Sequence, residues 1–143
     1  MNQLPLNISS AIPHRPPMLL IDEIVAQADQ TIHCRKRFNA DEFFVQGHFP
    51  GYPLVPGVIL CESALQAGAI LIASVSGQSS SVPVVTRLDG VKFKQMVRPG
   101  DTVDIHVELM ESLSNAFFLK GKITVGGKLA ARLEFACTTA DTN

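Results

Sequence analysis

Apolar and polar residues alternate along the C-terminal part of the chain. Every second residue is apolar at positions 103–109, and the same alternation returns at positions 129–137. A period of two is typical of a strand with one buried face and one solvated face. Positions 117–125 are predicted to form a third such strand. Gly126-Gly127, between the last two strands, predicts a two-residue hairpin turn.

The N-terminal part and the middle of the chain add further predicted strands. Residues 18–25 and 31–38 are predicted to pair as antiparallel strands, because the segment between them, 26–30, is polar and turn-like. Residues 82–93 predict another strand, with an interruption at Asp89-Gly90. A turn is expected at residues 99–101, where the sequence is Pro-Gly-Asp.

Residues 58–75, VILCESALQAGAILIASV, are apolar almost all round and predict a helix of about five turns. A membrane span needs about twenty apolar residues, but this segment contains Glu62 and Gln66. A helix that is apolar on every side is also typical of a core helix, and we prefer this interpretation. Its small residues allow a sheet to approach closely. The pattern therefore predicts an α+β fold, with one long helix against five or six antiparallel strands in a single domain, 1–143.

The composition supports a globular domain. Of 143 residues, 46% are hydrophobic and 17% are charged, and the formal net charge is −1. The charge favours neither nucleic acid nor an anionic membrane as partner. No targeting leader is recognisable, so we expect a cytoplasmic protein. The three cysteines have no metal-site spacing, so we expect no bound metal and favour buried free thiols over catalytic ones; they are Cys34, Cys61 and Cys137.

The stretch QGHFPGYPLVPGVILCE, residues 46–62, carries the candidate chemistry. Its glycines and prolines fix the backbone around His48, and rigid loops commonly present functional side chains. Histidine titrates near neutral pH, which suits a general base. Taken alone, however, His48 more often makes a hydrogen bond within a turn. Glu62 in an apolar helix is unusual, although it could also cap the helix start or pair with a surface cation.

Two neighbouring residues extend this pattern. Gln66 is four positions after Glu62, on the same helix face, where it could orient the carboxyl group by a hydrogen bond. Gly57 stands at the predicted helix start, where free amides bind carbonyl oxygens or anions. A base, an acid and an oxyanion donor suit proton abstraction beside a carbonyl, with loss of a hydroxyl group.

The remaining histidines are weaker candidates. His33 and His106 occupy polar strand positions and are interpreted as solvated. For His14-Arg15, which precede two prolines, we favour a structural role over phosphate binding.

The chain resembles the FabZ-type (3R)-3-hydroxyacyl-acyl-carrier-protein dehydratases over nearly its whole length. The motif at residues 46–66, QGHFPGYPLVPGVILCESALQ, carries most of this resemblance and has the same spacing from histidine to glutamate. The flanking stretches IPHRPPMLLIDEI (residues 12–24) and GVKFKQMVRPGD (residues 90–101) match in order. The resemblance implies a hot-dog fold, in which a curved antiparallel sheet wraps a central helix.

It also implies a mechanism without a cofactor. The enzyme would convert (3R)-3-hydroxyacyl-acyl-carrier-protein to the trans-2-enoyl product in fatty acid biosynthesis. His48 would remove the α-proton, and Glu62 from another subunit would help the hydroxyl group leave. The Gly57 amide would polarise the thioester carbonyl, the Leu54 carbonyl would orient His48, and Gln66 would fix Glu62. The implied partners are acyl carrier protein and a second copy of the chain, in a homodimer that can assemble further into a hexamer.

Several positions depart from the family pattern. Cys61 and Ser63 flank the glutamate where an aliphatic residue and alanine are usual, and Tyr52 fills a position that is often arginine. Residues 95–96, Gln-Met, replace a basic and an apolar residue. These changes leave open the same dehydration in a specialised polyene- or polyketide-type pathway. Because one fold hosts many functions, a hot-dog acyl thioesterase and a non-catalytic module that holds acyl chains are further alternatives.

Overall fold

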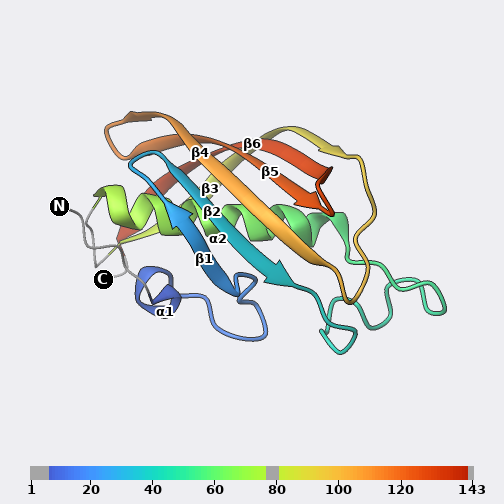
Figure 1. Cartoon of the computed structure of the whole chain (residues 1–143). Helices are drawn as coiled ribbons and strands as arrows, with labels where there is room; N and C mark the ends of the chain where they lie inside the picture. The colour runs from blue at the N-terminus through green and yellow to red at the C-terminus, as the bar shows by residue number, and fades with distance from the viewer. Residues whose placement is uncertain (1–6, 77–80, 142–143) are drawn as a thin grey trace.

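The computed structural model describes residues 7–76 and 81–141, and a six-stranded antiparallel sheet and one long helix dominate its architecture. The helix α2 (Gly57–Ser76) runs along one face of the curved sheet, as Figure 1 shows. The strand order is β1-β2-β4-β5-β6-β3. The strands are β1 (Glu23–Gln27), β2 (Thr31–Arg37), β3 (Ser81–Phe93), β4 (Thr102–Leu113), β5 (Ala116–Val125) and β6 (Lys128–Asp141).

The predicted helix and most of the predicted strands are confirmed. The alternation at positions 103–109 belongs to β4, whose even-numbered side chains in this stretch face outward while its odd-numbered ones are buried. Gly126 and Gly127 both have positive φ, 56° and 79°, as the hairpin turn between β5 and β6 requires. The interruption expected at Asp89-Gly90 is a register irregularity inside a continuous strand β3.

The strand predicted at residues 18–25 is wrong over residues 18–22. Strand β1 begins only at Glu23, and the apolar residues before it serve the core instead. Leu20 and Ile21 are 0% and 2% exposed. The Leu20 amide donates to the Gln66 side chain on α2 rather than to a neighbouring strand. Here a side-chain amide replaces the strand ladder as the partner of the backbone.

A short helix precedes β1. Helix α1 (Ile8–Ala11) is capped by Asn7, whose side chain accepts a hydrogen bond from the Ser9 amide at 3.0 Å. Residues 1–6 lie outside the described residues.

Small residues on α2 allow the close contact between helix and sheet. An added Cβ atom at Gly68 would lie 2.8 Å from Cζ of Phe135 on β6. On the sheet side, Gly121 of β5 faces a small residue of the helix, since a Cβ atom at Gly121 would lie 3.3 Å from Cβ of Ala64. The length and composition of α2 alone would allow a membrane span, but 61% of its most apolar window is buried. This burial matches the interpretation of α2 as a core helix.

Candidate active site

The loop before α2 holds His48 in a defined orientation. Nδ1 of His48 lies 3.0 Å from the Leu54 carbonyl oxygen. Because a carbonyl oxygen only accepts, Nδ1 carries the proton in this contact, and Nε2 is left unprotonated in the neutral ring. The Phe49 ring lies against the imidazole, with ring centroids 4.3 Å apart. The resulting tautomer is the one that a general base needs, with a free lone pair on Nε2.

Positive φ angles explain why glycine crowds this loop. Gly47 and Gly51 both have φ of 87°, a left-handed backbone conformation that other residues rarely adopt. Phe49 between them has φ of 59° without being glycine. Such strained backbone clusters at functional sites, where the surrounding structure holds it in place.

Glu62 lies in the second turn of α2, and Gln66 holds its carboxyl group. Nε2 of Gln66 donates to Oε2 of Glu62 at 3.0 Å. Gln66 is fully buried and also bonds the backbone of the segment before β1, donating to the Met18 carbonyl at 2.7 Å and accepting from the Leu20 amide at 2.8 Å. The contact between Gln66 and Glu62 that the spacing predicted is therefore present. One amide joins the carboxyl group, the helix and the N-terminal segment.

Gly57 is the first residue of α2, and an aromatic ring covers it. An added Cβ atom would lie 2.8 Å from Cε1 of Phe93, at the end of β3. The Ile59 and Leu60 amides bond the Pro56 carbonyl, whereas in the described part of the chain no acceptor is present for the Gly57 amide. A free amide at a helix start can stabilise negative charge on an oxygen atom.

The sequence did not reveal one further neighbour of Glu62. Nε2 of His14 lies 3.8 Å from Oε2 of Glu62, so His14, for which the sequence favours a structural role, contacts the candidate acid. Arg15 does have the structural role that we favoured, since its guanidinium donates to the carbonyls of Ser9, Ile12 and His14. The signal that could have found His14 is its place in the IPHRPP motif. Sequence spacing alone does not bring that motif to α2.

The cysteines have no catalytic environment. Cys34, Cys61 and Cys137 are free and buried. Burial raises the pKa of Cys34 to about 12 and that of Cys137 to about 11, and it also raises the pKa of Cys61. Because the thiolate is the reactive form, these thiols are poor nucleophiles.

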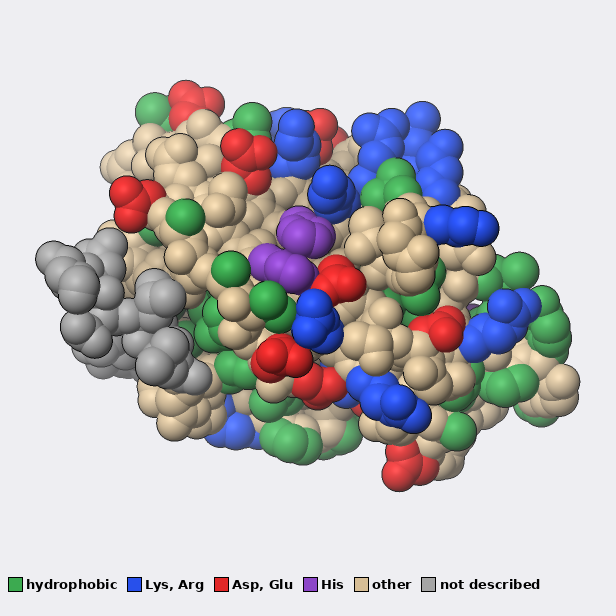
Figure 2. Space-filling model, in the orientation of Figure 1, with side chains coloured by type: hydrophobic (Ala, Val, Ile, Leu, Met, Phe, Trp, Pro, Cys, Tyr) green, Lys and Arg blue, Asp and Glu red, His purple; other side chains and the backbone are tan. Residues whose placement is uncertain are grey.

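The interpretation of His33 and His106 as solvated histidines is only partly right, because the two rings form a half-buried stack on the outer face of the sheet. Their centroids are 4.1 Å apart, and Nε2 of His33 lies 2.7 Å from Oδ1 of Asp104. Burial opposes ionisation of Asp104, but hydrogen bonds from His33 and Arg35 outweigh it and lower the pKa of this carboxyl group. Figure 2 shows histidines together in the middle of this face, among basic and acidic side chains.

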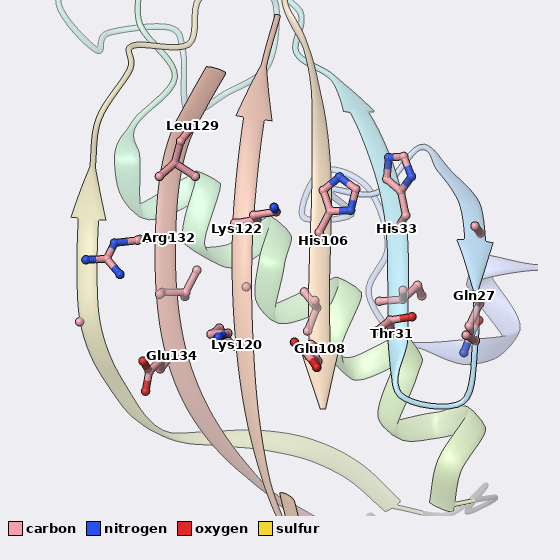
Figure 3. Close-up of a pocket in the computed structure, with 17 residues that line it drawn as sticks. Gln27, Thr31, His33, His106, Glu108, Lys120, Lys122, Leu129, Arg132 and Glu134 are labelled. Atoms are coloured by element: carbon pink, nitrogen blue, oxygen red, sulfur yellow. The ribbon is translucent and has the colours of Figure 1, made fainter. Parts of the chain in front are cut away.

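The same outer face carries a cleft of about 850 Å³, which is separate from the candidate site. In Figure 3 its labelled side chains project from the strands, while α2 lies behind the sheet. None of the five candidate residues lines this cleft. Among the described residues, no group of histidine, cysteine and carboxylate side chains could hold a metal ion.

A long helix wrapped by a curved antiparallel sheet is the arrangement of the hot-dog fold. A family model described as ApeI dehydratase matches residues 24–128. The chain is 37% identical over 123 residues to a 3-hydroxyacyl-[acyl-carrier-protein] dehydratase FabZ of Clostridium perfringens, covering 86% of this chain and 88% of that protein. The chain belongs to this family of ApeI- and FabZ-type dehydratases.

Other relatives and solved structures agree with this assignment. A FabZ dehydratase of Koribacter versatilis is 38% identical over 133 residues, which is 92% of this chain and 85% of that protein. The solved dehydratase heterocomplex ApeI:P from Xenorhabdus doucetiae superposes with a TM-score of 0.82 at 17% identity, over 94% of this chain and 91% of that one. The E. coli PaaI protein superposes with a TM-score of 0.65 at 16% identity, over 80% of each chain. These two structural likenesses establish the fold.

Proposed function

We propose that this protein dehydrates 3-hydroxyacyl thioesters carried on acyl carrier protein, with His48 as the base and Glu62 as the acid. The observation that carries the assignment of His48 is its hydrogen bond to the Leu54 carbonyl, which leaves Nε2 free. The FabZ relatives supply the substrate class through their names, 3-hydroxyacyl-[acyl-carrier-protein] dehydratases. Membership of the same family makes the same substrate the first one to test.

The proposed reaction uses only side chains and one backbone amide. Nε2 of His48 removes the proton from the carbon next to the thioester carbonyl, and the negative charge that develops on the carbonyl oxygen is stabilised by the Gly57 amide. The carboxyl group of Glu62 gives its proton to the 3-hydroxyl group, which leaves as water while a double bond forms between carbons 2 and 3. His48 ends with an extra proton and Glu62 as a carboxylate, and proton exchange with solvent restores both.

We further propose that two copies of the chain build each site. Strand β3 is an end strand of the sheet and has 13 residues, so within residues 7–76 and 81–141 one side of its backbone has no neighbouring strand. Its Val84, Leu88 and Phe93 side chains are 45%, 47% and 51% exposed. A long apolar edge strand is a ready template for pairing with another chain. Pairing of two β3 strands would cover it and would bring Phe93 and Gly57 next to the second copy.

The test is to incubate the purified protein with 3-hydroxyacyl-carrier protein and to measure the loss of water from this substrate by mass spectrometry. His48→Ala and Glu62→Gln should each lower kcat/KM by about 10²–10⁴-fold, the range typical of a lost acid or base. His106→Ala is the matched histidine control, because His106 faces the outer side of the sheet and should keep the wild-type rate. An unchanged rate for His48→Ala would remove His48 from the mechanism. Release of free acid without enoyl product would indicate a thioesterase instead.

A second candidate is the same dehydration in a specialised pathway. Two of the positions that depart from the family pattern lie together, since the Tyr52 hydroxyl group is 4.0 Å from Sδ of Met96. Arg98 fixes this tyrosine by donating to its hydroxyl oxygen at 2.6 Å. Competition between saturated and conjugated 3-hydroxyacyl substrates decides between the two pathways. A clear preference for saturated chains would exclude the specialised one.

A further inference from the structure

His14 approaches the proposed acid from the N-terminal segment. Its Nε2 atom is 3.8 Å from Oε2 of Glu62, and the two side chains are 30% and 29% exposed. This distance is beyond hydrogen-bond range, but catalytic contacts are often long in the absence of substrate. We propose that His14 is a positioning residue that stabilises the Glu62 carboxylate as it forms. The inference rests on the proposed function and extends it to a residue outside the motif at positions 46–66.

The backbone around His14 is held from both sides. On its N-terminal side, Arg15 Nη1 donates to the Ile12 carbonyl at 2.9 Å and Nη2 donates to the Ser9 carbonyl at 3.0 Å. On its C-terminal side, Gln66 bonds the Met18 carbonyl and the Leu20 amide. Ile12, two residues before His14, is 2% exposed and anchors the segment in the core. The ring therefore faces Glu62 from a fixed backbone, as a positioning residue must.

The ring nitrogens of His14 also differ in their surroundings. Nδ1 is buried and has no hydrogen-bond partner among the described residues. A proton on Nδ1 would be a buried donor without an acceptor, which is costly, so the neutral ring carries its proton on Nε2. Nε2 is the atom that faces Glu62. His14 can therefore donate toward the carboxylate.

The two oxygens of Glu62 then have different roles. Oε2 receives the Gln66 amide at 3.0 Å and faces His14, whereas no described residue bonds Oε1. In the proposed reaction Oε1 is the oxygen that hands its proton to the leaving hydroxyl group. The Glu62 carboxylate that results is stabilised at Oε2 by the N–H group of His14. A donor interacts more strongly with a charged acceptor than with a neutral one. His14 thus acts in the chemical step rather than in substrate binding.

The test compares His14→Phe, which removes the donor and keeps a ring, with His14→Gln, which restores an N–H donor. We expect His14→Phe to lower kcat on the order of tenfold with little change in KM, since the interaction strengthens as the Glu62 carboxylate forms in the transition state. His14→Gln should recover most of the rate. His106→Phe is the matched control on the outer face. Equal rates for wild type and His14→Phe would overturn the proposal. So would equal losses for both His14 variants with a lowered unfolding midpoint, because a purely structural role gives that result.

A second measurement does not depend on turnover. In ¹⁵N NMR spectra, His14 should appear as the tautomer protonated on Nε2, and its Nε2 signal should move in a Glu62→Gln variant. An Nε2 chemical shift that is the same in wild type and in Glu62→Gln would show that the two side chains do not interact. That result would overturn the inference independently of the measured dehydration activity. If instead the contact is present in the spectra but wild type shows no dehydration, the proposed function fails while the pairing stands.

Discussion

Replacing Gln66 by methionine should damage both the fold and the site, because one buried amide makes three hydrogen bonds. It accepts from the Leu20 amide, and it donates to the Met18 carbonyl and to Oε2 of Glu62. Methionine has nearly the same length and volume, so Gln66→Met leaves the packing largely intact. The substitution therefore isolates the hydrogen bonds.

The expected loss of stability depends on whether each hydrogen-bond partner of Gln66 can bond water once the amide is removed. Leu20 is 0% exposed, so its amide is left without an acceptor, at a cost of about 1–3 kcal/mol. Met18 is 40% exposed and the Glu62 side chain is 29% exposed, so water can replace those two bonds, at a net cost of about 1 kcal/mol each. The better burial of an apolar side chain returns about 1 kcal/mol. The free energy of unfolding should fall by about 2–4 kcal/mol.

Urea unfolding at one fixed protein concentration measures this change. Gln30→Met, at an exposed position in the turn between β1 and β2, is the matched control and should change the free energy of unfolding by less than about 0.5 kcal/mol. Dehydration activity per folded enzyme should also fall, since Glu62 loses the amide that holds Oε2. A loss of stability no larger than that of the control would refute the assignment of Gln66 as the residue that joins the helix to the N-terminal segment.

Three further predictions concern other parts of the fold. Burial, with the nearby charges of His33 and Lys122, lowers the pKa of His106 from 6.5, so below that pH the unfolded chain takes up a proton that the folded chain does not. Stability should therefore fall as the pH drops below about 6.5, and His106→Asn should reduce this loss in unfolding experiments; an equal loss in both proteins would contradict the assignment. Gly68→Ala should destabilise by about 1–3 kcal/mol, because the contact with Phe135 outweighs a helix-propensity gain of about 1 kcal/mol. Phe135→Leu should relieve that penalty in a double-mutant cycle, whereas strict additivity would argue against the close contact. A thiol reagent should modify the native protein slowly and the urea-unfolded protein fully at Cys34, Cys61 and Cys137, and rapid labelling of native protein would exclude their burial.

The sequence predicted those elements in which the alternation of apolar residues and the positions of turn residues indicate the same boundaries. Residues 103–109 alternate cleanly, and Gly126-Gly127 has the chemistry of a hairpin turn, so both features appear in the structure as expected. Residues 18–21 are different, because a short apolar run does not by itself decide between a strand and another buried segment. Only the Gln66 side chain, 46 residues away from Leu20, decides between them, and sequence spacing does not show such a contact.

In the candidate site, too, some contacts could be predicted from the sequence and others could not. The contact of Glu62 with Gln66 follows from helix geometry, because residues four apart share a face. Leu54 and His48 meet within one glycine- and proline-rich loop, where the resemblance to dehydratases placed them. His14 lies 48 positions before Glu62, and it reaches the carboxyl group only because Arg15 and Gln66 fix its segment. A histidine whose position depends on tertiary contacts has no local pattern of its own.

Gln66 connects the fold to the chemistry. A buried side-chain amide in an apolar helix is costly unless all its hydrogen bonds are made, and here they are made to the backbone of residues 18–20 and to the carboxyl group. The hydrogen bonds that hold this segment on α2 also hold Oε2 of Glu62 and bring His14 beside it. A substitution that loosens the segment therefore disturbs Glu62, the proposed acid, even without touching it. Stability and turnover should fall together in variants of Gln66 and Arg15, whereas variants of His48 should lose turnover alone.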